Sequence, residues 1–485
     1  MAGALLMPSR AALGQAAPGA ILPAEVRDAL EQAALPREAL AVWVQEVGEA
    51  GATTPPRLSW RADAPINPAS LTKLLTTYAA LDLLGPAWTW STPVWLQGPI
   101  NDGVLEGNLV IKGSGDPKLV LERLWLMLRR VRELGVRQIR GDIVLDRSSF
   151  VVPELNPADF DGEPLRPYNV NADALLLNYK TVTLTFTPDP ARAAAFVGVE
   201  PPLAGVRVDT RVPFSAGPPS GCGGDWRGEL GAQFGDPALI RLTGRFNPSC
   251  GEKAWPVAYI DPTTYNARAL LGIWYEMGGT LAGSVREGIA PASAPSFVSS
   301  SPPLAEVVRD INKFSNNVMA QQLFLTLALV QRGSGTPENG RAVLRDWMAE
   351  RFGAQAVAGL VIDNGSGLSR DTRVSVRLLA RTLQSAWAAP VMPEMIASLP
   401  INGLDGTARR FGSSPVRAHL KTGSLRDVRG VAGYVLGDSG RRYVIVAILN
   451  HPNAGADAAR APLAALLQWV ANDGPAVPSA PVGGA

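Results

Sequence analysis

The chain contains few of the side chains on which many enzymes rely. Its 485 residues include two histidines, His419 and His451, and two cysteines, Cys222 and Cys250. These four residues cannot supply the closely spaced ligand sets of structural or catalytic zinc sites. We therefore expect no metal, and nothing in the chain indicates another cofactor. A Ser-His-Asp or Cys-His enzyme would have to depend on one of only two histidines.

The chain also lacks an excess of charge of either sign. It has 45 basic and 43 acidic residues, which gives a formal net charge of +2 at pH 7. This balance argues against nucleic acid as a partner, because proteins that bind nucleic acid through bulk charge are strongly basic. Lysine is scarce, since only seven of the 45 basic residues are lysine. Each lysine that stands in a pattern is therefore informative.

Long apolar runs are absent as well. No run of about 18 apolar residues occurs, so the sequence predicts no transmembrane segment. Residues 1–20 are apolar and rich in alanine, and 15–17 resemble a cleavage site. We interpret this segment as a signal-peptide remnant without its basic part, which implies export. The Pro/Ala/Gly-rich tail at 473–485 is expected to be disordered.

The two cysteines lie in one Gly-rich region. If Cys222 and Cys250 pair, the disulfide would stabilise the fold by about 3 kcal/mol and would imply an oxidising compartment. The alternative is a pair of buried thiols. We favour the disulfide.

The most informative stretch is residues 67–73, Asn-Pro-Ala-Ser-Leu-Thr-Lys. Its Asn-Pro start is typical of a helix N-terminus, and the apolar residues that follow recur at helical spacing up to Gly85. Ser70 then lies in the first turn, where backbone N–H groups are unpaired and the helix dipole is positive. Lys73 follows one turn later on the same face. The stretch can thus supply a nucleophile, a base and stabilisation of an oxyanion.

Two later stretches fit the same chemistry. Ser315 and Asn317 flank Asn316 between two predicted helices, and both can face a cleft if this segment is not regular helix. Residues 419–424, His-Leu-Lys-Thr-Gly-Ser, enter a predicted strand on which Lys421 and Gly423 share a face. Taken singly, a helix cap and a β-turn would explain these patterns. In this order they match the S-x-x-K, S-D-N and K-T-G set of class A β-lactamases and penicillin-binding proteins, with Asn316 at the Asp position.

A lysine can act as a base only if its pKa falls. At the ordinary pKa of about 10.4, lysine is almost always protonated at pH 7. Burial or a neighbouring positive charge lowers the pKa, and Lys421 could supply that charge to Lys73. His419 lies two residues from Lys421, but we assign it a structural role because the lysine already fills the catalytic one.

On these motifs the chain resembles the class C, low-molecular-mass penicillin-binding proteins. These are D-alanyl-D-alanine carboxypeptidases/endopeptidases of the penicillin-binding protein 4 type. The resemblance runs over nearly the whole length and includes residues 107–110, 113–117, 141–144, 363–370, 405–407 and 432–434. The chain departs from the family pattern at Asn364, which directly precedes Gly365, and in the charged run at 426–429.

The resemblance implies an α/β (α+β) fold with a transpeptidase/β-lactamase-like domain and two smaller β-rich domains inserted between the first two motifs. The expected penicillin-binding domain comprises residues 21–92 and 281–472. Inserted domain II would comprise 93–170 and 257–280, and inserted domain III would comprise 171–256. This division agrees with the change to Gly-punctuated β-type sequence after about residue 91.

The resemblance also implies a periplasmic serine DD-peptidase that cleaves peptidoglycan stem peptides and their cross-links through an acyl-enzyme on Ser70. Lys73 would accept the Ser70 proton, while Ser315 and Lys421 would relay a proton to the leaving amine. Asn317 would orient the substrate amide. β-Lactam antibiotics would be covalent inhibitors.

The remaining implied roles concern substrate binding. Thr422 and Ser424 would hold the terminal carboxylate, and Gly423 would leave room for close packing or for approach of the ligand. An acidic residue, Asp161 or Glu163, would face the amine of diaminopimelate.

Two other functions stay open. A β-lactamase or esterase on the same scaffold would need a base for deacylation, which the sequence does not indicate. A catalytically idle peptidoglycan-binding protein is the other alternative, and the intact motif residues weigh against it. The balance of carboxypeptidase and endopeptidase activity and the oligomeric state also stay open.

Overall fold

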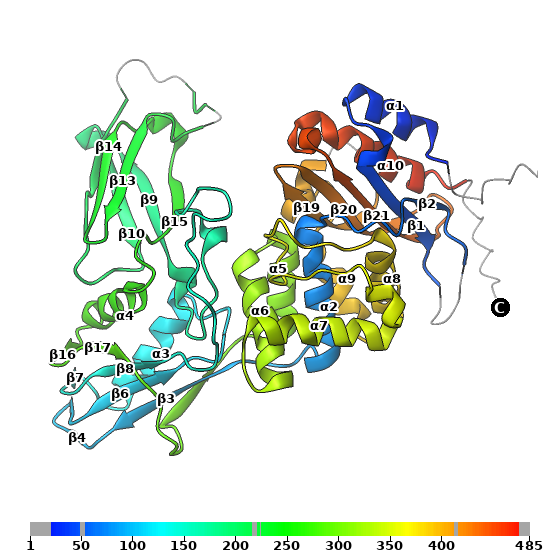
Figure 1. The fold of residues 1–485 in the computed structure, drawn as a ribbon. Helices are drawn as coiled ribbons and strands as arrows, with labels where there is room; N and C mark the ends of the chain where they lie inside the picture. The colour runs from blue at the N-terminus through cyan, green and yellow to red at the C-terminus, as the bar shows by residue number, and fades with distance from the viewer. Residues whose placement is uncertain (1–20, 49–53, 216–220, 224, 412–415, 475–485) are drawn as a thin grey trace, which may run out of the picture.

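The computed structural model describes residues 21–48, 54–215, 221–223, 225–411 and 416–474, without the side chains of 410 and 411. The expected signal-peptide remnant and residues 475–485 lie outside these ranges. The described chain forms two lobes (Figure 1), one from the terminal parts of the sequence and one from its middle. No helix within the described ranges is long and apolar enough to cross a bilayer.

A five-stranded antiparallel sheet in the order β19-β20-β21-β1-β2 lies at the centre of the first lobe. Side chains of successive residues point to opposite faces of such a sheet. Val42 and Val44 therefore pack with helices α1 and α10, whereas Ala41 and Trp43 pack with the other helices of this lobe. The elements are α1 (Ala24–Gln32), α10 (Ala461–Ala471), β1 (Leu40–Glu46), β2 (Leu58–Trp60), β19 (Ala418–Leu425), β20 (Val428–Leu436) and β21 (Arg442–Asn450).

Helix α2 (Thr72–Leu84) lies in the middle of the other helical layer. Residues from Thr72 to Leu81 are all buried, and the helix ends at Gly85, whose φ of +81° suits the C-terminal position. The helices of this lobe that contact α2 are α5 (Leu304–Phe314), α6 (Asn317–Arg332), α7 (Pro337–Phe352), α8 (Val376–Trp387) and α9 (Met392–Ser398). A helix that is apolar on every side is stable only when it is enclosed in this way.

At the end of the first lobe, the folded chain extends past residue 472, where the domain was expected to end. Asp473 was expected to begin the tail, yet its carboxylate accepts hydrogen bonds from Ser439 N at 2.8 Å and Tyr443 Oη at 2.9 Å. Burial alone would raise the pKa of Asp473, but its bonds with the side chain and backbone of Ser439 and with Tyr443 lower the pKa to about 2. The ordered chain therefore continues through this residue.

The second lobe begins with two sheets in the lower part of Figure 1, in the orders β17-β8-β6-β3-β18 and β16-β7-β5-β4. Their strands are β3 (Ser91–Gln97), β4 (Ile100–Asn101), β5 (Val104–Leu105), β6 (Asn108–Lys112), β7 (Gln138–Ile139), β8 (Ile143–Asp146), β16 (Thr280–Leu281), β17 (Val285–Glu287) and β18 (Phe297–Ser300). The sequence predicts one strand over 139–146. The structure divides that segment between β7 and β8, in two different sheets.

Two further sheets, in the orders β12-β10-β9-β15 and β11-β14-β13, form the upper part of this lobe. Cys222 and Cys250 are joined by a disulfide here. The strands are β9 (Thr181–Asp189), β10 (Ala194–Glu200), β11 (Arg207–Val208), β12 (Arg211–Pro213), β13 (Leu230–Asp236), β14 (Leu239–Gly244) and β15 (Lys253–Ala258). Helices α3 (Leu121–Glu133) and α4 (Tyr265–Glu276) contribute to a hydrophobic cluster that is continuous through both parts.

The strand pairing places the return to the first lobe later than the expected division at residue 280. β17 pairs with β8, and β18 pairs with β3, so residues up to Ser300 complete a sheet of the second lobe. These strands are short and only partly buried, and the sequence therefore gives little sign of them. We place the return to the first lobe after β18.

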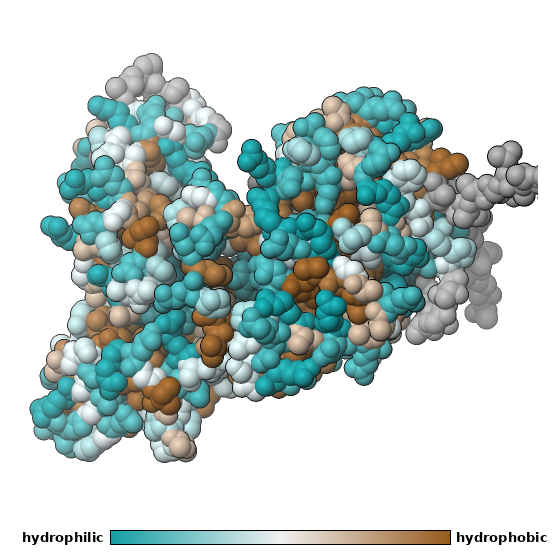
Figure 2. Space-filling view, in the orientation of Figure 1, coloured by the Kyte–Doolittle hydropathy of each residue, from teal (hydrophilic) through white to brown (hydrophobic). Residues whose placement is uncertain are grey.

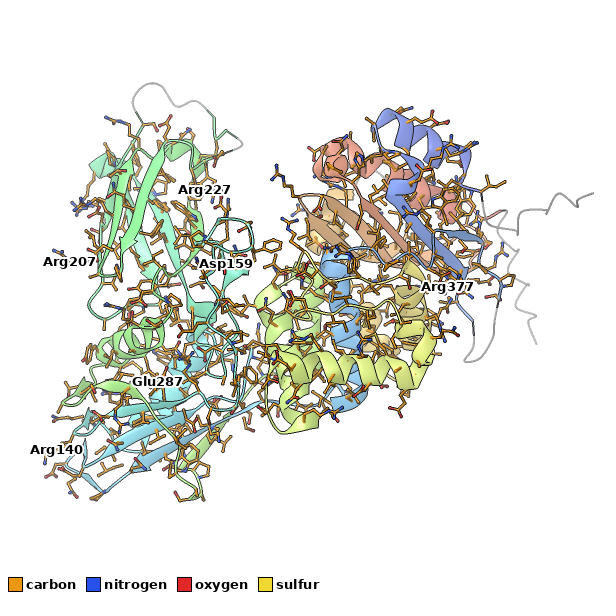
Figure 3. All side chains as sticks on the ribbon, viewed as in Figure 1. Arg140, Asp159, Arg207, Arg227, Glu287 and Arg377 are labelled. Carbon is orange, nitrogen blue, oxygen red and sulfur yellow. A yellow bond between two sulfur atoms is a disulfide. The ribbon has the colours of Figure 1, made fainter. Side chains whose placement is uncertain are left out.

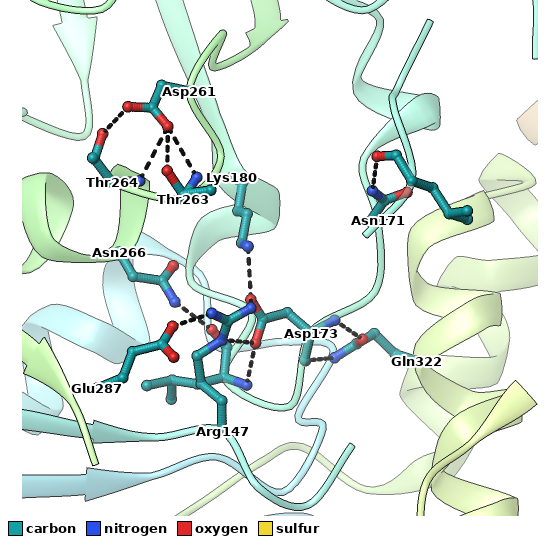
Figure 4. Close-up of polar contacts among 12 residues, drawn as sticks. Arg147, Asn171, Asp173, Lys180, Asp261, Thr263, Thr264, Asn266, Glu287 and Gln322 are labelled. Carbon is teal, nitrogen blue, oxygen red and sulfur yellow. Dashed lines mark hydrogen bonds and ion pairs between the residues drawn. The ribbon is translucent and has the colours of Figure 1, made fainter. Parts of the chain in front are cut away.

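Buried polar contacts fix the two lobes to each other (Figure 4). Gln322 on α6 is 0% exposed; its amide donates to Asp173 O at 2.8 Å and to Gly115 O at 3.2 Å, and it accepts from Asp173 N at 2.9 Å. The Asp173 carboxylate pairs with Lys180 at 2.7 Å and with Arg147 at 2.8 Å. The second lobe is thus attached to the helix that begins with Asn317.

Candidate active site

Ser70 lies at a tight corner before α2. Residues Ala69–Leu71 form a 3-10 turn, and Ala69 has a φ of +49°. Asn67 Oδ1 accepts a hydrogen bond from Ala69 N at 2.9 Å. The loop at 363–370 packs directly on this turn, because a Cβ on Gly367 would lie 1.9 Å from Ala69 O. Ser70 is therefore held from both sides.

Lys73 Nζ contacts three oxygens. It lies 2.9 Å from Ser70 Oγ, 2.7 Å from Asn317 Oδ1 and 2.6 Å from the backbone oxygen of Ser366. The amide and backbone oxygens can only accept hydrogen bonds, so they take the two N–H groups of a neutral amine. Its lone pair then faces the Ser70 hydroxyl. This is the arrangement of a base and a nucleophile.

Both lysines of the motifs are completely buried, at 0% exposure. Burial lowers the pKa of Lys73 well below its ordinary value, and the nearby charge of Lys421 lowers it further. Burial lowers the pKa of Lys421 to about 7. The lowered pKa favours the neutral form of Lys73, and a pKa of about 7 leaves Lys421 in both protonation states at neutral pH.

Ser315 owes its position to a break between α5 and α6. Its backbone is left-handed, with φ +56°, and Asn316 caps α6 by accepting a hydrogen bond from Met319 N at 3.0 Å. Lys421 Nζ donates to Ser315 Oγ at 2.8 Å. Because the helix is interrupted, Ser315 and Asn317 both face the same site, two residues apart.

β19 is the edge strand of the central sheet and passes close to the Ser70 turn. A Cβ on Gly423 would lie 2.8 Å from Pro68 O, so only glycine allows this approach without a shift. Leu420 N donates to Pro400 O, which shows that its N–H points away from β20. Since N–H directions alternate along a strand, Ser424 N–H points to the same outer side, where the cleft lies. Thr422 Oγ1 hydrogen-bonds Thr407 Oγ1 at 2.7 Å.

A cleft of about 1080 Å³ lies between the two lobes. Ser70, Ser315, Asn317 and Ser424 line it from the first lobe, and Asp161 lines it from the second. Lys73 and Lys421 lie behind this wall, in hydrogen-bond contact with the two serines. Thr422, Gly423 and Glu163 do not line the cleft.

Comparison with known proteins identifies the family to which the chain belongs. A profile of the D-Ala-D-Ala carboxypeptidase 3 (S13) family matches residues 22–472. The chain belongs to this family. It is a serine-type D-Ala-D-Ala carboxypeptidase, a hydrolase that acts on peptidoglycan.

Relatives of this S13 peptidase are similar over most of their length. A D-alanyl-D-alanine carboxypeptidase of Actinomadura sp. strain R39 is 28% identical over 416 residues, which cover 80% of this chain and 74% of the relative. The D-alanyl-D-alanine carboxypeptidase DacB of Haemophilus influenzae is 23% identical over 433 residues, 83% of this chain and 84% of the relative. The crystal structure of penicillin binding protein 4 from H. influenzae shares the fold, with a TM-score of 0.70, 22% identity and coverage of 91% and 97%.

In this S13 peptidase, Asp161 offers a carboxylate to the cleft. It accepts hydrogen bonds from Tyr168 Oη and Asn169 Nδ2, each at 2.8 Å. No basic side chain in the described part of the chain pairs with it, whereas Glu163 pairs with Arg166. Burial and the neighbouring Asp161 raise the pKa of Tyr168 to about 12, so the phenol remains a donor. Asp161 is therefore available to a cationic group of a ligand.

Sequence reasoning gave no role to several residues of the site. The Ser366 backbone oxygen, which accepts a hydrogen bond from Lys73, lies in segment 363–370, for which the sequence indicates only a family resemblance. Arg370 packs over the Phe160 ring at 4.7 Å, and this contact links the lobes at the cleft rim. Within the first lobe, Arg370 also pairs with Asp427 at 3.0 Å. Residues 178–180 form a left-handed turn with φ values of +42°, +54° and +48°, and two of them line the cleft. Their side chains, Asn, Tyr and Lys, give only a weak sign of such a conformation.

Proposed function

We propose that this protein is a periplasmic DD-peptidase that uses Ser70 as nucleophile and Lys73 as general base. The observation that carries the proposal is the contact set of Lys73 Nζ, which leaves a lone pair only toward Ser70 Oγ. The periplasmic setting is supported by the peptidoglycan substrate and by the disulfide of Cys222 and Cys250.

Acylation begins when Ser70 Oγ attacks the carbonyl carbon of the penultimate D-Ala and its proton passes to Lys73. The oxyanion receives hydrogen bonds from the backbone N–H groups of Ser70 and Ser424. The first lies at the start of a helix, where the dipole is positive, and the second points outward from an edge strand. Asn317 orients the substrate amide from the opposite wall.

The leaving amine takes a proton as the C–N bond breaks. Ser315 Oγ donates it and is reprotonated by Lys421, whose pKa of about 7 lets it give up a proton at neutral pH. Ser424, which lines the cleft, binds the terminal carboxylate, whereas Thr422 lies outside the cleft lining and its hydroxyl bonds Thr407. Water then attacks the ester on Ser70, and the stem peptide leaves with a new carboxylate.

The second lobe selects the substrate in this proposal. Asp161 faces the diaminopimelate amine, because it is the carboxylate among the described cleft residues and has no cationic partner. The open cleft also admits a cross-linked peptide, so the enzyme cleaves D-alanyl-diaminopimelate links as an endopeptidase. The charged run at 426–429 adds Arg426 to the cleft wall.

Hydrolysis of two substrates tests the proposal. Purified protein is incubated with an uncross-linked pentapeptide muropeptide and with a cross-linked dimer, and the products are separated by liquid chromatography and mass spectrometry. We expect D-Ala from the first and two monomers from the second, with no product from Ser70→Ala. Release of neither product by the wild type would contradict the proposal.

A further inference from the structure

A second cavity, separate from the catalytic cleft, lies between the lobes. Its volume is about 350 Å³, within the range of small-molecule sites. Residues 152–160 form one wall, and α6, α7 and the loop at 363–368 form the others. Figure 2 shows hydrophobic side chains along the border between the lobes, and Figure 3 shows Asp159 at that border.

This cavity shares a wall with the catalytic cleft. Phe160 and Leu368 line both spaces. Asn364 lies in the cavity wall, and its amide bonds the Leu368 backbone oxygen at 2.9 Å and accepts from Ser366 N at 3.1 Å. Ser366 in turn holds Lys73. The cavity wall is therefore connected through hydrogen bonds to a residue that contacts Lys73.

The charges of the cavity favour a cation. Three carboxylates line it, those of Asp159, Glu338 and Asp363, against one guanidinium, that of Arg341. Arg341 pairs with Glu338 at 2.7 Å and otherwise donates to a backbone oxygen. Asp159 and Asp363 have no ion-pair partner among the described residues. Two negative charges thus remain uncompensated.

The other walls indicate the rest of the ligand. The accessible apolar part of the wall is Leu155, which is 57% exposed, whereas Phe324 and Leu325 on α6 also line the cavity but are only 1% and 3% exposed. Asn169, only 6% exposed, also lines the cavity; its Nδ2 donates to Asp161, and its Oδ1 has no hydrogen-bond partner among the described residues. A ligand with an aliphatic chain and an N–H donor matches these surfaces.

We propose that this cavity binds a primary ammonium group on a short aliphatic chain, supplied by the diaminopimelate arm of a second stem peptide that is not being cleaved. The choice of a stem peptide rests on the proposed function, since a cross-linked network presents many such arms beside the one in the cleft. Asp159 and Asp363 bind the ammonium, and Leu155 contacts the carbon chain.

Calorimetric binding to the Ser70→Ala protein tests the proposal without turnover. The probe is the tripeptide L-alanyl-γ-D-glutamyl-meso-diaminopimelate, which lacks the scissile bond. We expect two binding events, one in the cleft and one in the cavity. The double variant Asp159→Asn/Asp363→Asn should weaken the second event at least about tenfold and leave the first unchanged. Asp161→Asn should weaken the first event, in the cleft, and leave the second, in the cavity, unchanged.

Further variants separate the alternatives. Gln321→Trp places an indole in the cavity from α6 and should remove the same event as the double variant. The tripeptide acetylated on its amines should not bind the cavity. Cadaverine should bind the cavity but should not displace the tripeptide at equal concentration. If cadaverine binds the cavity and the tripeptide does not, the ligand is not a stem peptide.

One result would overturn the cavity site altogether. If every binding event responds to Asp161→Asn and none to the double variant or to Gln321→Trp, the cavity is not a site. A failure of the proposed function is distinct from this result, since it would appear as absent hydrolysis by the wild type.

Discussion

At the scale of single residues, the chemistry depends on the burial of two amines. A lysine is a useful base only when it is neutral, and desolvation and the charge of Lys421 both lower the pKa of Lys73 and so favour its neutral form. The chain thereby performs with lysine the proton transfers that other hydrolases assign to histidine.

Lys73→Arg tests this role. A guanidinium stays protonated and cannot accept the Ser70 proton, so acylation by penicillin should slow by about 10²- to 10⁴-fold. In the wild type the acylation rate should rise with pH as Lys73 loses its proton, with a midpoint well below the ordinary lysine pKa. Stopped-flow acylation rates across pH measure both effects. Lys253→Arg on β15 is the control, and wild-type rates in Lys73→Arg would show that the base is elsewhere.

Burial of Lys421 should also change how the free energy of unfolding depends on pH. Its pKa falls from 10.5 to about 7 on folding, so between these values the folded state binds fewer protons than the unfolded state. Stability therefore rises with pH in this window, and the cost of burial is greatest at or below pH 7. Lys421→Met should raise the free energy of unfolding at pH 7 by about 2 kcal/mol while abolishing activity. In urea unfolding, the free energy by which Lys421→Met exceeds the wild type should shrink as the pH approaches 10.5. If that free-energy difference stays constant with pH or is negative, burial of a charged Lys421 is not what destabilises the wild type.

At the scale of elements, the site is the meeting point of the Ser70 turn, the α5–α6 break and β19. The sequence predicts Ser70, Lys73, Ser315 and Lys421 because each lies at a recognisable local feature. It does not predict the Ser366 oxygen, since a backbone group can be assigned only when the packing of its loop is known. Nor does it predict the left-handed turn at 178–180, whose strain is offset by contacts such as the buried ion pair of Lys180 with Asp173.

Gly423→Ala tests how closely β19 must approach the Ser70 turn. The new Cβ would lie 2.8 Å from Pro68 O, a backbone atom that cannot move aside alone. We expect acylation by penicillin to fall about 10- to 100-fold because the reacting groups are misplaced, and stability to fall by about 1–3 kcal/mol. Gly198→Ala on β10, where the nearest atom is 3.9 Å away, is the matched control. Equal effects of the two changes would argue against a close fit at β19.

At the scale of the whole molecule, catalysis and substrate recognition are divided between the lobes. The second lobe contributes no part of the Ser-Lys-Ser-Lys set, yet Asp161 lines the cleft. Gln322 and Asp173 hold the lobes in register, so the distance between Ser70 and Asp161 is set by the fold. The two-lobed plan was predictable from the family resemblance, whereas the extent of the insert depended on strand pairing between distant segments.

Asp161→Asn tests the division of labour. Loss of one charge-assisted contact should cost about 1.5–3 kcal/mol, a 10- to 150-fold lower kcat/KM for diaminopimelate peptides. Acylation by a simple penicillin should hardly change. Glu163→Gln is the control in the same loop, because Glu163 pairs with Arg166 outside the cleft. Equal losses with both substrates would mean that Asp161 supports the fold and not the substrate.

The most direct test of the central claim is the mass of the protein after reaction with penicillin. A β-lactam resembles the D-Ala-D-Ala amide, and its acyl-enzyme should hydrolyse slowly because the described cleft wall places no carboxylate of the first lobe beside Ser70. Intact-protein mass spectrometry should show one penicilloyl adduct on the wild type, mapped to Ser70 by peptide analysis, and none on Ser70→Ala. An adduct on another residue, or an adduct that persists in Ser70→Ala, would contradict the assignment of the nucleophile.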